Sequence, residues 1–178
     1  MVRKIFTALL CTFICWPSSA QIAANPSAKQ MIEQLTASPN GSPRNLFVEE
    51  VSMPTDSPTS AAPVPARPYL SLLIQFDFNS ATVRAESHPA LVNLSKALQS
   101  ARLSGSRFAI EGHTDAKGAP DYNLKLSQQR AQAVCDFLQA RGVMESRLQA
   151  SGKGASELAN STQPFAAMNR RVRIVNLD

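Results

Sequence analysis

Between residue 69 and the C-terminus, three segments alternate apolar and polar residues, the pattern of β-strands that bury one face. Because each strand has a single apolar face, all helices that cover the sheet are expected on the same side of it. The apolar positions are Leu70, Leu72, Ile74, Phe76 and Phe78 in the first segment, Phe108 and Ile110 in the second, and Val172 and Ile174 in the third.

Two long segments with helical spacing lie between these strands. The first helix is expected to start near His88-Pro89, with a stripe of Leu91, Leu94, Leu98 and Arg102. The second is expected from Tyr122 to Arg141, with Gly142 as its C-cap. A short strand at residues 148–150 and a brief helix before Asn169 complete the order β-α-β-α-β-α-β. The sequence therefore predicts a two-layer α/β sandwich over residues 69–178, with a small mixed sheet and helices on one face.

The first twenty residues have the pattern of a secretory signal peptide. Arg3 and Lys4 precede an apolar run at residues 5–16, which is shorter than the roughly 20 residues that span a bilayer. We expect cleavage after Ala20; an uncleaved anchor is the alternative. A lipid-modified cysteine is disfavoured, because Cys11 and Cys15 follow bulky residues. In the mature chain only Cys135 remains, so no internal disulfide can form.

Residues 21–68 are predicted to contain a short helix followed by a linker. The helix is expected over Pro26–Thr36 with Asn25 as its N-cap, and its thin apolar stripe leaves two alternatives: docking on the domain or a partner, or a marginal helix in a tail. Residues 38–68 carry seven prolines among Ser, Thr and Ala, a composition typical of a semi-extended linker with a reach on the order of 90 Å.

The charge of the chain excludes one class of partner. The formal charge of +5 includes Arg3 and Lys4, so the mature chain is only mildly basic. No dense run of Lys and Arg with interleaved aromatic residues is present, and we expect no binding to nucleic acid. A modest positive charge is compatible with an anionic cell-wall polymer.

Asp115 and Arg130 form the candidate binding site. Asp115 follows the strand that ends near Glu111, and Arg130 lies on the apolar stripe of the second long helix, where a charge needs a partner. A carboxylate and a planar guanidinium can together bind a zwitterion, the first taking its ammonium and the second its carboxylate. The alternative is an internal Asp115–Arg130 salt bridge that only ties the loop to the helix.

Five motifs in order resemble the OmpA-like peptidoglycan-binding domain and cover nearly all of residues 70–177. They are Ile74-x-Phe76-x-Phe78-Asn79-Ser80-Ala81, Glu111-Gly112-His113-Thr114-Asp115, Asn123-Leu124-x-Leu126-Ser127-x-x-Arg130-Ala131-x-x-Val134, Gly152-x-Gly154 and Asn169-Arg170-Arg171-Val172. The resemblance implies noncovalent binding of the diaminopimelate residue in the peptide stem of peptidoglycan. It also implies that Asp115 takes the ammonium of diaminopimelate and Arg130 the neighbouring carboxylate.

Four further residues are predicted to line the ligand-binding site or to support it. Thr114 either hydrogen-bonds the ligand or shapes the Asp115 loop, Asn123 and Ser127 either cap the helix or line the pocket, and Arg171 supports the site from the sheet surface. The chain departs from the family pattern at Phe165-Ala166, preceded by Pro164, where a Gly-Arg pair is common, and at Lys153, where an aromatic residue is common.

These observations predict a cell-wall anchor in the periplasm of a Gram-negative bacterium, with peptidoglycan as partner; association with the outer membrane stays open. The alternative is an adaptor subunit of a larger cell-envelope complex, with residues 21–68 binding a protein. We expect that the protein is not an enzyme and binds no metal or cofactor. His88 and His113 cannot supply a zinc-hydrolase ligand set, and no histidine is predicted near Cys135.

Overall fold

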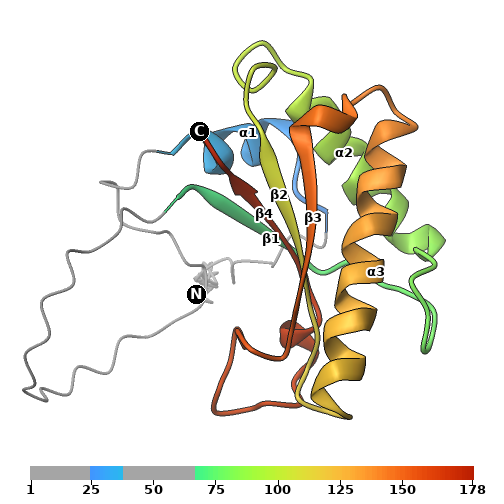
Figure 1. Cartoon of the computed structure of the whole chain (residues 1–178). Helices are drawn as coiled ribbons and strands as arrows, with labels where there is room; N and C mark the ends of the chain where they lie inside the picture. The colour runs from blue at the N-terminus through green and yellow to red at the C-terminus, as the bar shows by residue number, and fades with distance from the viewer. Residues whose placement is uncertain (1–24, 38–66) are drawn as a thin grey trace, which may run out of the picture.

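The computed structural model describes residues 25–37 and 67–178 as a sheet with helices packed on one face (Figure 1). The predicted signal peptide and nearly all of the predicted linker lie outside these ranges. Four strands pair in the order β1-β4-β2-β3, with β2 and β3 parallel and β4 antiparallel to both of its neighbours. The strands are β1 (Tyr69–Leu72), β2 (Phe108–His113), β3 (Leu148–Gly154) and β4 (Val172–Asn176). The predicted α/β sandwich with a mixed sheet is confirmed.

Within the described ranges, three α-helices and three short 3₁₀ turns accompany the sheet. They are α1 (Ala28–Thr36), α2 (His88–Leu98) and α3 (Pro120–Gln139), with η1 (Ala85–Ser87), η2 (Glu145–Arg147) and η3 (Ala167–Asn169). The helix expected before Asn169 is thus a single 3₁₀ turn. Helix α3 begins at Pro120, earlier than predicted, and Ala140 caps it in place of Gly142. Arg102, expected on the stripe of α2, lies beyond the end of that helix and is exposed.

The first strand is shorter than its alternating pattern predicted. Leu72 pairs with Val172, the first residue of β4, so the chain has no strand to pair with beyond that point. Ile74 is still buried, and Phe76 forms only an isolated bridge with Val83. Phe78, expected on the buried face, is fully exposed. The prediction of a strand through Phe78 was therefore wrong at its C-terminal end.

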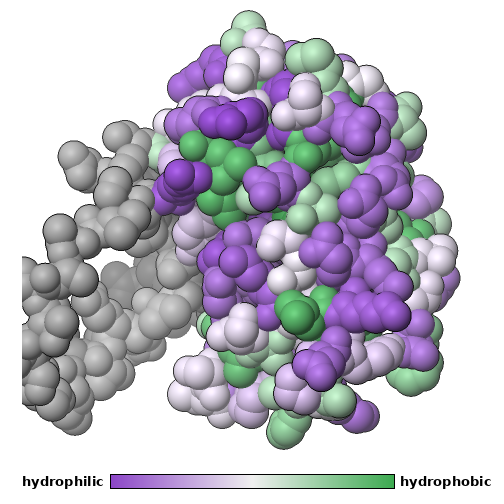
Figure 2. Space-filling model, viewed as in Figure 1, coloured by the Kyte–Doolittle hydropathy of each residue, from purple (hydrophilic) through white to green (hydrophobic). Residues whose placement is uncertain are grey.

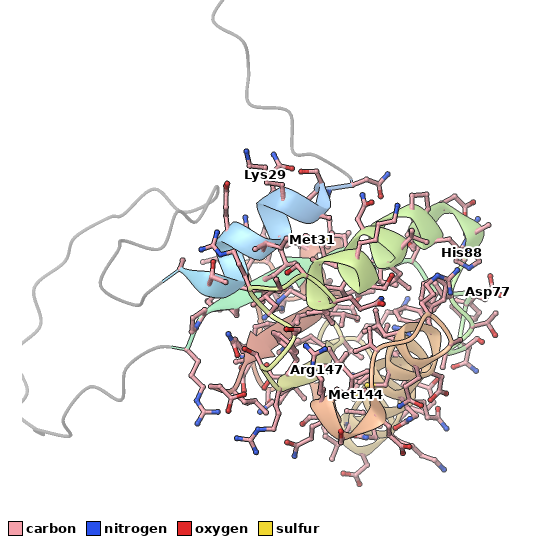
Figure 3. The ribbon with its side chains drawn as sticks, turned by 90° about the horizontal axis from the view of Figure 1, so that it is seen from above. Lys29, Met31, Asp77, His88, Met144 and Arg147 are labelled. Atoms are coloured by element: carbon pink, nitrogen blue, oxygen red, sulfur yellow. The ribbon has the colours of Figure 1, made fainter. Side chains whose placement is uncertain are left out.

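Helix α1 packs into the same core as the sheet. Its N-cap is Ser27, which forms a capping box with Gln30, so the predicted cap at Asn25 was wrong. Met31 and Leu35 are completely buried within the main apolar cluster. Figure 3 shows Met31 pointing toward α2 and Lys29 pointing away from it. The folded unit therefore includes α1 as well as residues 67–178.

Two polar contacts hold α1 in place in addition to its apolar side. The side-chain amide of Asn176 in β4 donates to the carbonyl of Leu35 at 3.0 Å, which satisfies the C-terminal end of α1. Asn93 in α2 donates to the carbonyl of Pro26 at 3.1 Å, just before the helix starts. The two ends of α1 are thus bonded to different elements of the domain.

Two glycines allow α3 to lie directly against the ends of β2 and β3. A Cβ on Gly112 would lie 2.1 Å from the carbonyl oxygen of Ser127, and one on Gly152 would lie 2.6 Å from that of Leu124. No larger residue fits at these approaches. The end of β2, from which the Asp115 loop departs, is therefore fixed against α3.

The face of the sheet away from the helices is polar. Arg173 donates to Glu111 at 2.6 Å and to Glu157 at 2.8 Å, and Lys153 lies within 3.5 Å of both carboxylates. Figure 2, in the view of Figure 1, shows hydrophilic residues over much of the visible face, with smaller hydrophobic patches between them. This ion-pair network explains why one face of the sheet needs no covering helix.

Candidate functional site

The Asp115 loop is held by hydrogen bonds from three directions. The amide of Thr114 donates to the carbonyl of Gly154 at 2.8 Å, and the side chain of Asn123 donates to the carbonyls of Lys117 and Asp115 at 3.0 and 3.4 Å. The Asp115 carboxylate itself accepts from the amide of Lys117 at 3.2 Å, an Asx turn. The position of this carboxylate is therefore set by β3 and by the first turns of α3.

The Asp115 carboxylate forms an ion pair with Arg170. The Oδ2 atom lies 2.7 Å from NH1 of Arg170, and only 14% of the Asp115 side chain is exposed, against 48% for Arg170. Arg170 lies between η3 and β4, so the ion pair links the Asp115 loop to a segment that is far from it in the sequence.

Arg130 is half-buried, and within the part of the chain that the structure describes its partners are neutral groups. Its Nε donates to the carbonyl of Ser80 at 3.1 Å, and its guanidinium lies 4.9 Å from the centre of the Phe76 ring, a cation–π contact. Burial lowers the pKa of Arg130, and the positive charge of Arg170 lowers it further, whereas Asp115 opposes these effects. Asp115 and Arg130 do not form the direct salt bridge that was the alternative interpretation of their spacing.

A cleft of about 350 Å³ brings the two guanidinium groups together. Its walls come from the segment after β1, from α3 and from η3, and the lining residues are Leu73, Ile74, Gln75, Phe76, Arg130, Ala167 and Arg170. Asp115 is not part of this lining but contacts Arg170 directly. The arrangement offers two guanidinium groups to a ligand carboxylate and one carboxylate to a ligand ammonium, so it suits a zwitterion.

A second cavity, of about 490 Å³, lies along the N-terminal turns of α3 and the end of β3. It is lined by Ala116, Gly118, Pro120, Asp121, Asn123, Leu124, Gly152, Lys153, Gly154, Ala155 and Ser156. Neither Arg130 nor Arg170 lines it. It therefore lacks the paired cations that a carboxylate ligand requires, and the smaller cleft is the better candidate.

Three of the predicted site residues lie buried behind the Asp115 loop. Thr114, Asn123 and Ser127 are each less than 5% exposed. Ser127 donates to the carbonyl of Leu124 at 2.8 Å and accepts from the amide of Gly154 at 2.9 Å, so its hydroxyl ties α3 to β3. The side chain of Asn123 supports the Asp115 loop, whereas the buried hydroxyl of Thr114 has no hydrogen-bond partner among the described residues. None of the three residues lines the cleft.

Arg171 lies on the other side of the sheet from the cleft. Its guanidinium donates to the carbonyl of Glu157 at 3.2 Å, and burial lowers its pKa, with repulsion from Arg173 adding to the effect. Beside it, His113 is buried, and burial together with the charges of Arg171 and Arg173 lowers its pKa to about 4. The ring of His113 is therefore neutral at pH 7, and neither of its nitrogens has a hydrogen-bond partner among the described residues.

Sequence reasoning missed Arg170, the residue that contacts Asp115, although the Asn169-Arg170-Arg171 motif contains it. It also missed the role of Asn169. This fully buried residue donates to the carbonyls of Asn160, Gln163 and Pro164 and accepts from the amide of Asn160. The carbonyl of Pro164 also accepts from Ala116 in the Asp115 loop at 3.0 Å. The segment that departs from the family pattern is therefore bonded directly to the site.

Comparison with known proteins places this geometry in a family. Outer membrane protein A of Serratia marcescens is 38% identical over 84 residues, a match that covers 47% of this chain and 23% of that protein, so the chain spans only a minor part of that relative. The crystal structure of the peptidoglycan-associated lipoprotein of Burkholderia pseudomallei is 29% identical with a TM-score of 0.51, covering 60% of this chain and 88% of that one.

A structure described as the cell wall anchor of the T6SS from Pseudomonas aeruginosa is 31% identical with a TM-score of 0.51, covering 65% of this chain and 85% of that one. Among the described helices, none is long and apolar enough to cross a membrane. Residues 75–171 match the OmpA family over more than half of the chain, and they contain most of the cleft lining, the Asp115 loop and the Asn169 turn. The chain belongs to the OmpA family.

Proposed function

We propose that the domain binds peptidoglycan noncovalently, through the diaminopimelate residue of its peptide stem, and thereby attaches the chain to the cell wall. The single observation that carries the proposal is the cleft lined by Arg130 and Arg170, the second of which is paired with the Asp115 carboxylate next to the cleft. The end of a diaminopimelate side chain presents one ammonium and one carboxylate on the same carbon. Arg130 and Arg170 in the cleft complement the carboxylate, and Asp115 beside Arg170 complements the ammonium.

The energies of these contacts predict moderate affinity for one stem. Each charge-assisted hydrogen bond contributes about 1.5–3 kcal/mol net, and the ordering of a flexible peptide offsets part of this. A wall that offers many stems raises the occupancy through rebinding. The domain would act as an anchor and perform no chemistry on the wall.

Pelleting with purified peptidoglycan sacculi tests the proposal. The chain from residue 21 to 178, which retains α1, is incubated with sacculi, and wild type is compared with Asp115→Asn and Arg130→Gln. We expect wild type in the pellet and both variants mainly in the supernatant. Arg141→Gln is the matched control, because it removes the same charge from an exposed residue beyond the end of α3.

Three outcomes of this experiment contradict the proposal. Wild type that stays in the supernatant excludes an anchor, and site variants that bind as well as wild type exclude the cleft. Soluble muropeptides released during the incubation would show that the protein is an enzyme.

The adaptor function is retained as a second candidate, because a similar solved structure is described as the cell wall anchor of a secretion system. Within residues 21–68, the apolar side of α1 is occupied by the domain, so a protein partner would have to use other residues. Co-purification from envelope extracts, with and without residues 38–66, separates an adaptor from a simple anchor. Fractionation of the same extracts tests the proposed periplasmic location, the signal peptide and the open question of outer-membrane association.

A further inference from the structure

Arg170 occupies the part of the site where an ammonium group of a ligand would bind. Its NH1 atom lies 2.7 Å from Oδ2 of Asp115, and the other carboxylate oxygen accepts from the Lys117 amide. Because only 14% of the Asp115 side chain is exposed, a ligand ammonium competes with Arg170 for this carboxylate. Binding at the acidic half of the site is therefore an exchange of one cation for another.

The charges of the site are unbalanced toward the positive side. Asp115 is the one acid paired with Arg170, whereas Arg130 is bonded to a carbonyl and an aromatic ring. Arg130 and Arg170 line the same cleft, so their like charges repel each other. The group that this cleft lacks is an anion, and a carboxylate between the two guanidinium groups would supply it.

Arg170 has the freedom to exchange partners. Nearly half of its side chain is exposed, and among residues 25–37 and 67–178 the guanidinium is hydrogen-bonded to Asp115 alone. Its backbone is anchored by the neighbouring Asn169, which is fully buried and makes four hydrogen bonds to the 160–164 segment. A rotation of the side chain toward Arg130 thus requires no movement of the loop.

We propose that Arg170 determines the specificity of the site for a zwitterion, by competing with the ligand for Asp115. The carboxylate of a zwitterion draws Arg170 toward Arg130, and Asp115 is then free to accept the ammonium. A ligand with an ammonium alone would displace Arg170 and leave two guanidinium groups without an anion in a half-buried cleft, which is unfavourable. This inference rests on the proposed function, and it predicts selection of stems that contain diaminopimelate over stems that contain lysine.

Two soluble stem peptides that differ only at their third residue test this role. One carries meso-diaminopimelate and the other lysine, which lacks the side-chain carboxylate. Affinities are measured by calorimetry for residues 21–178 as wild type, Arg170→Gln and Arg141→Gln. For wild type and Arg141→Gln we expect a preference for the diaminopimelate peptide of about 10- to 100-fold, the effect of one charge-assisted hydrogen-bond pair.

The two peptides should respond to Arg170→Gln in opposite directions. The diaminopimelate peptide loses one guanidinium partner and should bind about 10-fold more weakly. The lysine peptide no longer competes with Arg170 for Asp115 and should bind more tightly than it binds wild type. A residue that merely supported the loop would weaken both peptides together.

The failure of this inference can be distinguished from the failure of the proposed function. If wild type prefers the diaminopimelate peptide and Arg170→Gln keeps the same ratio of affinities, the role of Arg170 is overturned and the function stands. If wild type binds neither peptide, both are overturned. Urea midpoints of all three proteins, measured on the same samples, show whether Arg170→Gln remains folded under the binding conditions.

Discussion

Replacing Met31 with alanine tests whether α1 is a structural part of the domain. Met31 is fully buried in the main apolar cluster, so its truncation removes apolar contacts and leaves a cavity between α1 and α2. Burial of a methionine side chain contributes about 1.5–3 kcal/mol, and the cavity raises the cost of truncation to about 2–5 kcal/mol. The bonds from Asn93 and Asn176 oppose a shift of α1 into the cavity. We therefore expect a loss of about 3 kcal/mol.

Urea unfolding of residues 21–178, followed by far-UV circular dichroism, measures this loss. Lys29→Ala is the matched control, because it truncates a long side chain on the exposed side of the same helix. Alanine favours helix at both positions, so helix propensity cannot explain a loss at Met31 alone. A Met31→Ala protein within about 0.5 kcal/mol of wild type would refute the packing role. An m-value that falls together with the midpoint would mean that α1 detaches before the rest unfolds.

Two further predictions concern β2. Gly112→Ala should lower stability by about 3 kcal/mol or more, because its Cβ would lie 2.1 Å from the Ser127 carbonyl, whereas Gly105→Ala, with no atom within 4 Å, should be nearly neutral in thermal unfolding. The folded-state pKa of His113 is lowered to about 4 from its ordinary 6.5. The stabilisation of the folded state by neutral His113 should therefore be fully present above pH 6.5 and should fall by about 3 kcal/mol as the pH is lowered toward 4. Urea midpoints at pH 7 and pH 4 should show this loss in wild type and not in His113→Gln; equal losses in the two proteins would contradict it.

The fold could be predicted from the sequence because its core is regular. Alternating apolar residues in β2 and β4 and the stripe of α3 report burial directly, and burial decides the layers. The end of β1 could not be predicted in the same way. Ile74 is buried although the pairing of β1 with β4 ends at Leu72, so the apolar–polar alternation continues beyond the end of the strand. Periodicity records which side chains are buried and carries no information on which backbone groups are paired.

The docking of α1 depends on a partner surface that its own residues do not reveal. Met31 and Leu35 form a stripe too thin to distinguish a docked helix from a marginal one. The decisive groups lie elsewhere in the chain, in Asn93 and in Asn176 near the C-terminus. These polar residues have no local pattern that indicates a contact with a distant helix. Long-range capping of this kind becomes visible only when the elements are assembled.

The choice between Arg170 and Arg171 could have been made from the sequence. Val172 and Ile174 are the apolar positions of β4 and face the helices, so Arg171 and Arg173 must face the opposite side of the sheet. Continuing the alternation one step before the strand places Arg170 on the side of Val172, where α3 carries Arg130. The structure agrees, because Arg170 lines the cleft with Arg130 while Arg171 reaches Glu157. Where two arginines are adjacent before a strand, the alternation of side chains between the two faces of that strand predicts which arginine lies on the side of the cleft.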